Sequence, residues 1–503
     1  MSVTLPLPPE SEELPPLRLK RRPDRLLRTL IVGAGEAGRA IARDLRRAPD
    51  FGLLPIGFVD DDVTKKRIYG LKVLGGTDLL ENVARANLID AVVIAIPSLS
   101  PAKIRSMVRR AAAAGVSVRF LPSFANALER DARLEDLRRL RINDLLGRGE
   151  MHVTGPSTRG VVAGKSVLVT GAGGSIGSEL ALQLRSFEPA RLVLLDHDET
   201  NLHGLQMTLD GHGLLDDDGL VVADIRDRRR VLHTFERVKP DVVFHAAAHK
   251  HLPLLERHPT EAVKSNVMGT ENLVDAALAT GVGRFILIST DKAADPVSVL
   301  GASKRMAELL LQSRTGKGTA FASVRFGNVL GSRGSLLTMV ARQIASGEAV
   351  TVTHPDATRY FMTIEEAAGL VIEASSMARE GEIFILDMGQ PVRIVDLVRR
   401  YAAQVHLDED DLAIRFTGLR PGEKLDESLS AFSEALMPTE NDAISVVHPQ
   451  PVSPDFEQLL ADLRNAAENN DDGATLNVLR SAIPEYRSVP VAACTPSPYP
   501  DWY

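Results

Sequence analysis

The stretch Ser166–Leu180, S-V-L-V-T-G-A-G-G-S-I-G-S-E-L, decides the fold of this 503-residue chain. An apolar run of strand length leads without a break into Gly171, Gly174 and Gly177, and a helical pattern follows. Small residues in such a turn let the backbone approach a dinucleotide, and the N-terminus of the next helix faces its phosphates. The stretch therefore predicts a nucleotide-binding strand–turn–helix of a doubly wound α/β fold, with Ser175 and Ile176 beside the cofactor.

A carboxylate follows at the expected distance. The next apolar run, Arg191–Leu195, ends at Asp196, about 20 residues after the glycines, where such a fold places an acid. There it would accept hydrogen bonds from both ribose hydroxyls of an adenosine and repel a 2′-phosphate, which favours NAD over NADP. The alternative is that Asp196 only caps the following helix.

Two later segments are predicted to flank the same cofactor. The run ending in Asp224 and Ile225 suits the edge of an adenine. The segment D-V-V-F-H-A-A-A, residues 241–248, has small residues that would let the cofactor lie across the strand ends at Ala246 and Ala248.

A similar pattern stands near the start of the chain. A β-branched run from Arg28 leads into Gly33-x-Gly35-x-x-Gly38, and a second strand, Leu53–Val59, ends in acidic residues. Further strands at 90–97 and 116–121, separated by a helix at 102–114, predict a small doubly wound domain. A lone glycine fingerprint leaves open whether this domain binds a nucleotide or only keeps a tight turn.

The domain organisation follows from these patterns. We expect two Rossmann-like parallel-sheet domains, the second with a smaller substrate-binding part. The predicted segments are a disordered leader (1–27), an accessory domain (28–125), a helical linker (126–165), a catalytic domain (166–485) and a Pro-rich tail (486–503).

Composition bounds the function. The net charge of -7 is spread along the chain, so nucleic-acid binding is not expected. The only cysteine, Cys494, excludes an internal disulfide and fits a reducing cytoplasm. The N-terminus lacks the apolar core of a signal peptide, and no window reaches the ~18 apolar residues of a spanning helix, so no integral membrane segment is predicted.

Proton-transfer groups gather between Ser289 and Lys304. Thr290, Asp291 and Lys292 follow the apolar strand 284–289, and the carboxyl ends of strands are where open α/β sheets bind ligands. Leu300-x-x-x-Lys304 has the spacing of the Tyr-x-x-x-Lys pair of short-chain dehydrogenases, and four residues put both side chains on one helix face. The tyrosine is replaced here by leucine.

A series of motifs follows in order from Val167 onward: Thr170–Leu180, His245–His251, Ser289–Ala293, Gly301–Lys304, Arg325–Ser332, Thr358–Met362 and Arg420–Lys424. In these motifs the sequence closely resembles the nucleotide-sugar 4,6-dehydratases of the polysaccharide-biosynthesis family, extended short-chain dehydrogenases acting on UDP-N-acetylglucosamine. The first domain resembles the one that precedes the catalytic part in large members, but the membrane-spanning helices with which these usually begin are not recognised here.

The resemblance implies a chemistry. NAD takes a hydride from C4 of the sugar, water is lost across C5 and C6, and the hydride returns to C6. It implies that Asp291 is the general acid for the C6 hydroxyl, Lys292 the base at C5, Thr290 a hydrogen-bond partner of O4, and Lys304 the partner of the nicotinamide ribose. Lys292 can be a base only if its pKa is lowered; otherwise it is a charged clamp on the diphosphate.

Other residues are predicted to hold the UDP-sugar. Lys250, Asn328, Arg359 and Arg420 are candidates for the diphosphate or sugar, and Glu423 for the uridine ribose, although the charged ones could equally form surface ion pairs.

A metal site is not expected at the three nearby histidines, His245, His249 and His251, because no carboxylate pattern accompanies them. On the following helix, Asn266 is expected to brace the neighbouring strand through main-chain hydrogen bonds.

The sequence thus predicts an NAD-dependent UDP-N-acetylglucosamine 4,6-dehydratase, assembled as a homo-oligomer. The alternatives are a nucleotide-sugar 4-epimerase, a dehydratase that eliminates elsewhere on the ring, and a non-catalytic nucleotide-sugar sensor. Leu300 favours the last; if the enzyme is active, the O4 proton would leave through Thr290 to Asp291 or through a water.

Overall fold

The structure is a computed structural model that divides the chain into two units, residues 1–147 and 148–503. It describes residues 26–47, 53–62, 66–96, 107, 110–111, 114, 116–120, 138–139, 156–332, 336–404, 412–448 and 451–487. Most of the predicted leader, Pro-rich tail and linker and most of the helix at 102–114 lie outside the described residues.

The first unit is built on a mostly parallel sheet with the strand order β3-β4-β2-β1-β5-β6-β7 in its described part. Helix α1 packs through Ile41 and Leu45 on one face, and α2 packs through Leu80 on the other. This unit is therefore doubly wound, as predicted. Its elements are β1 (Leu27–Val32), α1 (Glu36–Arg47), β2 (Leu53–Val59), β3 (Arg67–Ile68), β4 (Leu71–Val73), α2 (Leu80–Ala86), β5 (Ala91–Ile94), β6 (Ser117–Phe120) and β7 (Arg138–Arg139).

The glycine turn of the first unit has the geometry of a close strand–helix crossing. Gly33 has a positive φ of 98°, and a Cβ on Gly38 would lie 1.9 Å from the carbonyl oxygen of Gly33. The amide of Ala34 donates to Asp60 Oδ2 at 2.5 Å. Glycine is thus required at both positions by the turn itself.

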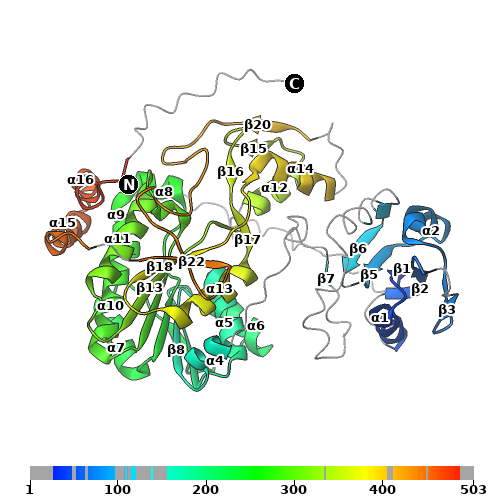
Figure 1. Ribbon diagram of the computed structural model, residues 1–503, viewed down its shortest axis with the longest axis horizontal. Helices are drawn as coiled ribbons and strands as arrows, with labels where there is room; N and C mark the ends of the chain where they lie inside the picture. The colour runs from blue at the N-terminus through cyan, green and yellow to red at the C-terminus, as the bar shows by residue number, and fades with distance from the viewer. Residues whose placement is uncertain are drawn as a thin grey trace, which may run out of the picture. The chain divides into compact units, whose positions relative to one another are not determined.

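The second unit is built on a sheet with the order β10-β9-β8-β11-β12-β13-β18-β22-β21 (Figure 1). The strands from β10 to β18 pair in parallel, and β22 and β21 add antiparallel pairs at one edge. The strand bounds are β8 (Ser166–Thr170), β9 (Arg191–Asp196), β10 (Leu220–Val222), β11 (Val242–His245), β12 (Arg284–Ile288), β13 (Ala320–Arg325), β18 (Glu382–Leu386), β21 (Met437–Pro438) and β22 (Ile444–Val447).

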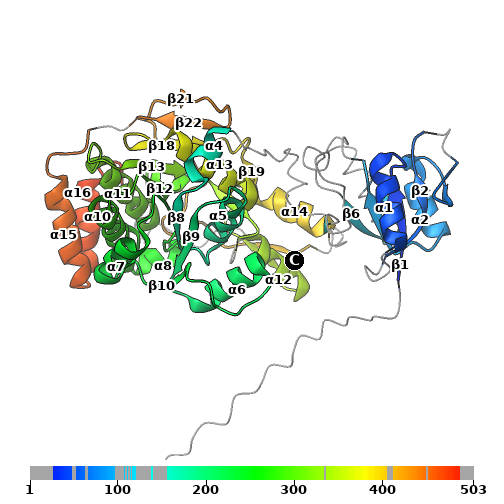
Figure 2. The same cartoon turned by 90° about the horizontal axis from the view of Figure 1, so that it is seen from below.

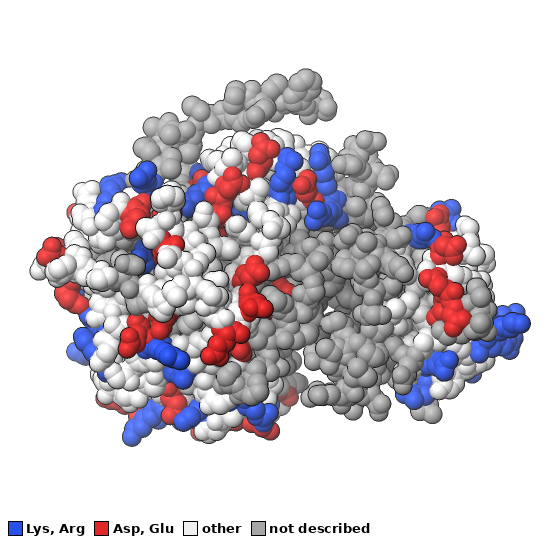
Figure 3. All heavy atoms as spheres, in the orientation of Figure 1, with Lys and Arg blue, Asp and Glu red and all other residues white. Residues whose placement is uncertain are grey.

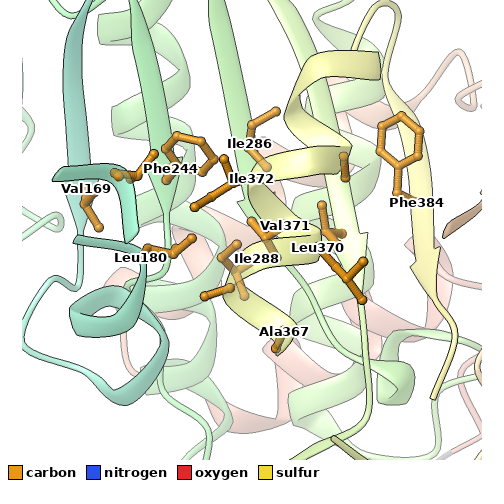
Figure 4. Close-up of a cluster of buried hydrophobic side chains, with 14 of the residues drawn as sticks. Val169, Leu180, Phe244, Ile286, Ile288, Ala367, Leu370, Val371, Ile372 and Phe384 are labelled. Atoms are coloured by element: carbon orange, nitrogen blue, oxygen red, sulfur yellow. The ribbon is translucent and has the colours of Figure 1, made fainter. Parts of the chain in front are cut away.

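Helices cover both faces of this sheet (Figures 1 and 2). On one face α4 (Pro156–Val162), α5 (Ser175–Ser186), α6 (Glu199–Asp210) and α13 (Ile364–Met377) bury their apolar sides. Figure 4 shows Leu180 of α5 near Val169 of β8, and Ile372 of α13 beside Phe244 of β11. The other face carries α7 (Arg228–Val238), α10 (Gly269–Thr280) and α11 (Val299–Ser313). The predicted fold class, doubly wound α/β, is confirmed for both units.

Residues 156–162, predicted to lie in the linker, instead form α4 of the second unit. Thr158 donates a buried hydrogen bond to Glu373 of α13, and Val162 is fully buried in the core.

A smaller part lies at one end of the second unit's sheet (Figure 1). Its apolar core joins α12 and α14 to β15 and β20 through Val340, Val350 and Val398. It is built from β14 (Asn328–Leu330), α12 (Leu336–Ala345), β15 (Val350–Val352), β16 (Thr358–Arg359), β17 (Phe361–Thr363), β19 (Val392–Arg393), α14 (Ile394–Gln404) and β20 (Ile414–Phe416), which pair as β14–β17, β15–β20 and β16–β19.

A terminal helical hairpin, α15 (Phe456–Glu468) and α16 (Asp472–Ala482), packs outside α11 (Figure 2). Phe456 and Leu463 of the hairpin bury Met306 and Leu310 of α11.

Charge is mixed on the surface. On the face drawn in Figure 3, acidic and basic side chains are interspersed over the described surface of the second unit. This agrees with a net charge that is spread along the chain.

Candidate active site

The site begins where the strand order of the second unit reverses, between β8 and β11. Open α/β sheets bind ligands at this point, beyond the carboxyl ends of the strands. A Cβ on Gly171 would lie 2.6 Å from Cα of Ala247, which follows β11, and a Cβ on Gly177 would lie 2.1 Å from the carbonyl oxygen of Gly171. The two loops therefore touch through bare backbone, and Ser175 and Ile176 form the first turn of α5 directly behind them.

Asp196 holds the glycine loop in place. Its Oδ2 accepts from the amide of Gly173 at 2.8 Å, and its Oδ1 accepts from the amide of Asp198 at 3.0 Å. The cap of α6 is Asp198 rather than Asp196, so the alternative role as a helix cap does not apply. The amide of Ala223 donates to the carbonyl of Asp196 at 2.9 Å, which brings Asp224 and Ile225 beside this end of the site.

The loop after β11 is open. Ala246 is half-buried, whereas Ala248 and Lys250 are exposed. Asn266 spans this loop: its Oδ1 accepts from the amide of His249 at 2.8 Å, and its Nδ2 donates to the carbonyl of His249 at 3.1 Å. The predicted bracing role of Asn266 is confirmed.

Asn266 lies in a π-helix, Val263–Met268, that sequence periodicity did not predict. The wider turn precedes α10 without interrupting the helical path, and such turns are frequent at functional sites. Asn266 also makes a third hydrogen bond, in which its Nδ2 donates to Ser303 Oγ of α11 at 3.0 Å.

His245 is a structural residue. Its two ring nitrogens lie 2.8 and 2.9 Å from the hydroxyl oxygens of Thr170 and Thr270, and burial lowers its pKa well below the usual value. Within the described residues, no three His, Cys, Asp or Glu side chains are grouped as metal ligands.

Lys304 lies in α11, one turn after Leu300, as the spacing predicted. Both side chains are buried, with 6% exposure each. Burial lowers the pKa of Lys304 to about 8, although Glu308 acts in the opposite direction. In the described part of the chain we find no hydrogen-bond partner for Lys304 Nζ, which leaves its donors available. Leu300 instead packs among Leu255, Ala262 and Val299.

Thr290, Asp291 and Lys292 follow β12 and form one hydrogen-bonded group. The short 3₁₀ turn Asp291–Ala293 is capped by Thr290. Asp291 is fully buried, and its Oδ1 accepts from Thr290 Oγ1 at 2.9 Å and from Lys292 Nζ at 2.9 Å. Lys292 Nζ also lies 3.4 Å from Asn328 Oδ1. The structure thus brings together four of the predicted site residues.

Glu427 joins this group and was missed by sequence reasoning. Its carboxylate is buried, with Oε1 3.8 Å from Lys292 Nζ. Burial raises the pKa of Glu427; Asp291 adds to this shift, whereas Lys292 opposes it. The one available signal was its position three residues after Lys424, in the segment that begins R-P-G-E-K.

The charges around Lys292 do not produce the lowered pKa that its role as a base would need. Burial alone would lower the pKa of Lys292, but Asp291 and Glu427 outweigh it, and the net pKa is raised. The lowered pKa that a base at this position requires is therefore not found, because two acids rather than a cation surround the ammonium group.

Two free acceptors remain in the cluster. Among the described residues, Asp291 Oδ2 and Glu427 Oε2 are buried and have no hydrogen-bond partner. Buried polar atoms are normally paired, so such oxygens are candidates for substrate hydroxyls.

Arg359 has a different role from the one predicted. Both of its terminal nitrogens are engaged inside the protein: Nη1 donates to the carbonyls of Thr358 and Leu425, and Nη2 donates to the carbonyl of Lys424 and to Glu423 Oε1. A bidentate grip on phosphate would break these bonds. Arg359 therefore orders the segment that carries Glu427.

Glu423 and Arg420 also differ in availability. Glu423 is nearly buried and accepts hydrogen bonds from Arg359, from Arg420 Nε at 3.1 Å and from Thr353 Oγ1 at 3.1 Å. Burial alone would raise the pKa of Glu423, but the two arginines lower it. The Arg420 side chain is 52% exposed and remains able to reach a phosphate.

A buried ion pair lies next to the end of β12, just before the group formed by Thr290, Asp291 and Lys292. Arg325 donates to both oxygens of Glu308, at 2.7 and 2.6 Å, and Ser289 Oγ donates to Glu308 Oε1 at 2.6 Å. A second acid, Glu434, accepts from Arg325 Nη1 at 2.7 Å. The group ties β12, β13 and α11 together immediately before Thr290.

This fold and site can now be compared with known proteins. Residues 167–449, more than half of the chain, match the family described as polysaccharide biosynthesis protein, and residues 17–122 match a CoA-binding domain family. The chain belongs to the polysaccharide biosynthesis protein family.

Named relatives narrow the chemistry. The chain is 42% identical over 410 residues to the probable polysaccharide biosynthesis protein EpsC of Bacillus subtilis, covering 80% of this chain and 68% of EpsC. It is 32% identical over 270 residues to the inverting UDP-N-acetylglucosamine 4,6-dehydratase of Campylobacter jejuni (52% and 77% coverage). It is also 32% identical over 276 residues to the UDP-glucose 4-epimerase of Rickettsia prowazekii (53% and 77%). The chain is therefore related to nucleotide-sugar dehydratases and epimerases.

A solved structure agrees with the fold. Pen from Bacillus thuringiensis superposes with a TM-score of 0.52 at 32% identity, covering 58% of this chain and 90% of Pen. None of the helices in the part of the chain that the structure describes has the length and apolarity needed to cross a bilayer.

Proposed function

We propose that the protein is an NAD-dependent UDP-N-acetylglucosamine 4,6-dehydratase. The observation that carries the proposal is the buried Asp291–Lys292 pair, bonded to Thr290 at the carboxyl end of β12, in the same unit as a glycine loop at the switch point of the sheet. An acid and a nitrogen base side by side are what elimination across C5 and C6 requires.

The residues at the switch point fit a dinucleotide. The backbone around Gly171 and Gly177 has no room for a Cβ, so the glycine loop, the start of α5 and the loop after β11 pack closely at the switch point. Lys304 adds a buried ammonium group that has no hydrogen-bond partner among the described residues. We expect Asp196 to lie at the adenosine ribose and Lys304 at the nicotinamide ribose. When bound, NAD supplies the hydride acceptor for C4 and returns the hydride to C6.

The hydrogen-bond chain gives the O4 proton a route that does not need a tyrosine. Thr290 Oγ1 lies 2.9 Å from Asp291 Oδ1, so a hydroxyl bonded to Thr290 can pass its proton through Thr290 to the carboxylate. Asp291 then holds the proton that the departing C6 hydroxyl needs. One proton thus moves from O4 to the water that leaves, which balances the reaction.

We propose that Lys292 takes the C5 proton and returns it once the hydride has reached C6. With Asn328 3.4 Å from its Nζ, the ammonium group is held toward the small substrate-binding part. We propose that Asn328, Arg420 and Lys250 contact the UDP-sugar there, and that Arg359 and Glu423 position the loop around it.

A 4-epimerase is the main alternative, because one group of relatives carries that name. Epimerisation also oxidises C4, but it needs neither an acid at O6 nor a base at C5. The buried Asp291–Lys292 pair therefore favours the dehydratase.

The decisive experiment is product analysis. Purified protein is incubated with UDP-N-acetylglucosamine, and the product is followed by mass and NMR. Loss of one water with a new C6 methyl group is expected. An isomer of unchanged mass would support the epimerase, water loss without that methyl would support elimination elsewhere, and binding without reaction would support a sensor.

Variants test the acid and base. Asp291→Asn and Lys292→Met are expected to lower kcat at least about 100-fold, in line with the loss of general acid–base catalysis. Asp275→Asn, which removes a carboxylate from a surface ion pair with Arg228, is the matched control and should leave kcat unchanged. Normal turnover in both site variants would refute these assignments.

A further inference from the structure

Glu427 has no part in the chemistry described above, yet it lies inside the cluster. Two buried carboxylates, Asp291 and Glu427, flank a single ammonium group, at 2.9 and 3.8 Å from Lys292 Nζ. Glu427 Oε2 has no partner among the described residues. A carboxylate so deeply buried is rarely kept without a function or full pairing.

In the proposed dehydration one proton of Lys292 needs an acceptor, and Glu427 is available to take it. Asp291 must begin as a carboxylate, because it receives the O4 proton before giving it to O6. Lys292 must begin as a neutral amine, because it receives the C5 proton. In the ion pair with Asp291, however, Lys292 carries one proton too many, and that proton must move to a third group.

We propose that Glu427 accepts this proton from Lys292 Nζ and holds it during turnover, and that it thereby acts as a positioning residue that sets the protonation of Lys292. This inference rests on the proposed function. The step breaks one N–H bond of Lys292 and forms one O–H bond on Glu427 Oε1, and no other reactant takes part. A shift of about 1 Å would bring the 3.8 Å separation into hydrogen-bonding range.

The surroundings suit such an exchange. Glu427 faces four charged groups: Lys292, Asp291, Arg359 and Lys424. Burial and Asp291 favour its protonated form, while the three cations favour the carboxylate. Two of these cations already donate hydrogen bonds to other groups. Arg359 donates to backbone carbonyls, and Lys424 donates to the carbonyl of Ala294 at 3.1 Å. Lys292 is therefore the one cation of this set that is left to exchange a proton with Glu427.

The cycle then closes without a proton from outside. Glu427 keeps its proton while Lys292 takes the C5 proton and later returns it to C5. At the end Asp291 is again a carboxylate, Lys292 a neutral amine and Glu427 a carboxylic acid. The arrangement is ready for a second turnover.

The first test is the pH profile of kcat and KM for wild type, Glu427→Gln and Glu427→Asp. Without Glu427 as acceptor, Lys292 must lose its proton to solvent. The kcat of Glu427→Gln should therefore be at least about 100-fold lower than that of wild type at pH 7, and it should rise about tenfold per pH unit above pH 7. Glu427→Asp should keep the wild-type profile at a reduced rate. Glu261→Gln, a surface change on α9 (Pro259–Ala262), is the control.

A merely structural role of Glu427 would lower kcat by the same factor at every pH. The proposal is therefore overturned if the pH profile of kcat has the same shape in Glu427→Gln as in wild type, whatever the overall rate. Thermal unfolding of each variant shows whether it is folded.

The second test needs no turnover. Protein labelled with [13Cε]lysine is titrated by NMR, with the Lys292 signal assigned by its absence in Lys292→Met. The titration of Lys292 should change in Glu427→Gln, and an unchanged titration overturns this proposal whatever the activity. Absence of dehydrated product from wild type, by contrast, overturns the proposed function alone.

Discussion

Lys304 has a cost in stability beside its proposed role in binding the cofactor. Its pKa of about 8 in the folded chain lies below the ordinary 10.5, so folding disfavours the charged form. This penalty is fully present below pH 8 and is relieved as the pH rises from 8 to 10.5. Cofactor-free Lys304→Met should therefore be more stable than wild type by roughly 3 kcal/mol at pH 7 and by much less near pH 10.

Urea unfolding of cofactor-free protein at both pH values measures this difference. Lys264→Met, which removes a partly exposed lysine paired with Glu261, is the control and should bring no gain. NAD retention should be lost in Lys304→Met. An equal gain at pH 7 and pH 10 would show that burial of the charge is not the cause.

Leu300 gives a second prediction at this scale. Because the O4 proton can pass through Thr290 to Asp291, restoring a phenol should add no needed group, and Leu300→Tyr should leave kcat within about twofold or lower it. The phenol would also enter the apolar cluster of Leu255 and Val299. Leu300→Phe separates the effect of ring size from that of the hydroxyl. A tenfold or larger gain in Leu300→Tyr alone would show that Leu300 is a defect.

Single residues were predictable where the motif itself is local. Thr290, Asp291 and Lys292 are consecutive, so their proximity follows from the sequence. Glu427 was not predictable, because its burial depends on a loop that Arg359 holds from a distant strand. The raised pKa of Lys292 escaped prediction for the same reason, since one of the acids that cause it comes from that loop.

At the scale of elements, the glycine turn before α5 is tightly constrained. Gly177→Ala would place a methyl group 2.1 Å from the carbonyl oxygen of Gly171, so helix and strand would have to separate and cofactor binding should fall at least about tenfold. Gly204→Ala in α6 is the matched control, because a Cβ there meets no atom within 4 Å. Gly204→Ala should stabilise the protein by about 0.5–1 kcal/mol.

Titration with NAD and thermal unfolding of both variants measure these effects. Equal NAD affinity of Gly177→Ala and wild type would contradict the close approach of the two segments.

Element prediction succeeded where periodicity and turn residues agree. β2 and β8 have the bounds that were predicted, since each is an apolar run that ends at a polar or glycine residue. The π-helix before α10 was read as ordinary helix, because its extra residue per turn leaves little trace in a short apolar pattern. The two- and three-residue strand pairs of the small part, such as β16–β19, are too short to show a period.

At the scale of the whole molecule, each unit has its own apolar core. Clusters around Ile31 and Leu30 serve the first unit, and separate clusters around Val169 and Leu168 serve the second. A fragment of residues 148–503 should therefore fold alone and keep its NAD content and a kcat within about twofold of the full chain. A fragment that aggregates or lacks NAD would refute this independence.

A fragment of residues 166–503 is the informative comparison. It lacks α4, whose Val161 and Val162 are buried against the sheet, and each such side chain contributes about 1.5–3 kcal/mol. This shorter fragment should unfold at a clearly lower temperature than 148–503.

The two-unit organisation was predictable because two glycine fingerprints each follow a strand. The starting point of the second unit was not, since the short stretch P-S-T-R-G-V-V at 156–162 gives no sign that α4 is anchored by Thr158 to Glu373.

The terminal hairpin has a consequence for the order in which the chain is made. Met306 and Leu310 lie on the same helix as Lys304 and are covered by residues 456–486, which a ribosome adds more than 140 residues later. Until those residues are made, Met306 and Leu310 of α11 lack the side chains that bury them in the folded protein. Nascent chains that stop before α15 should therefore expose an apolar strip of the kind that chaperones recognise.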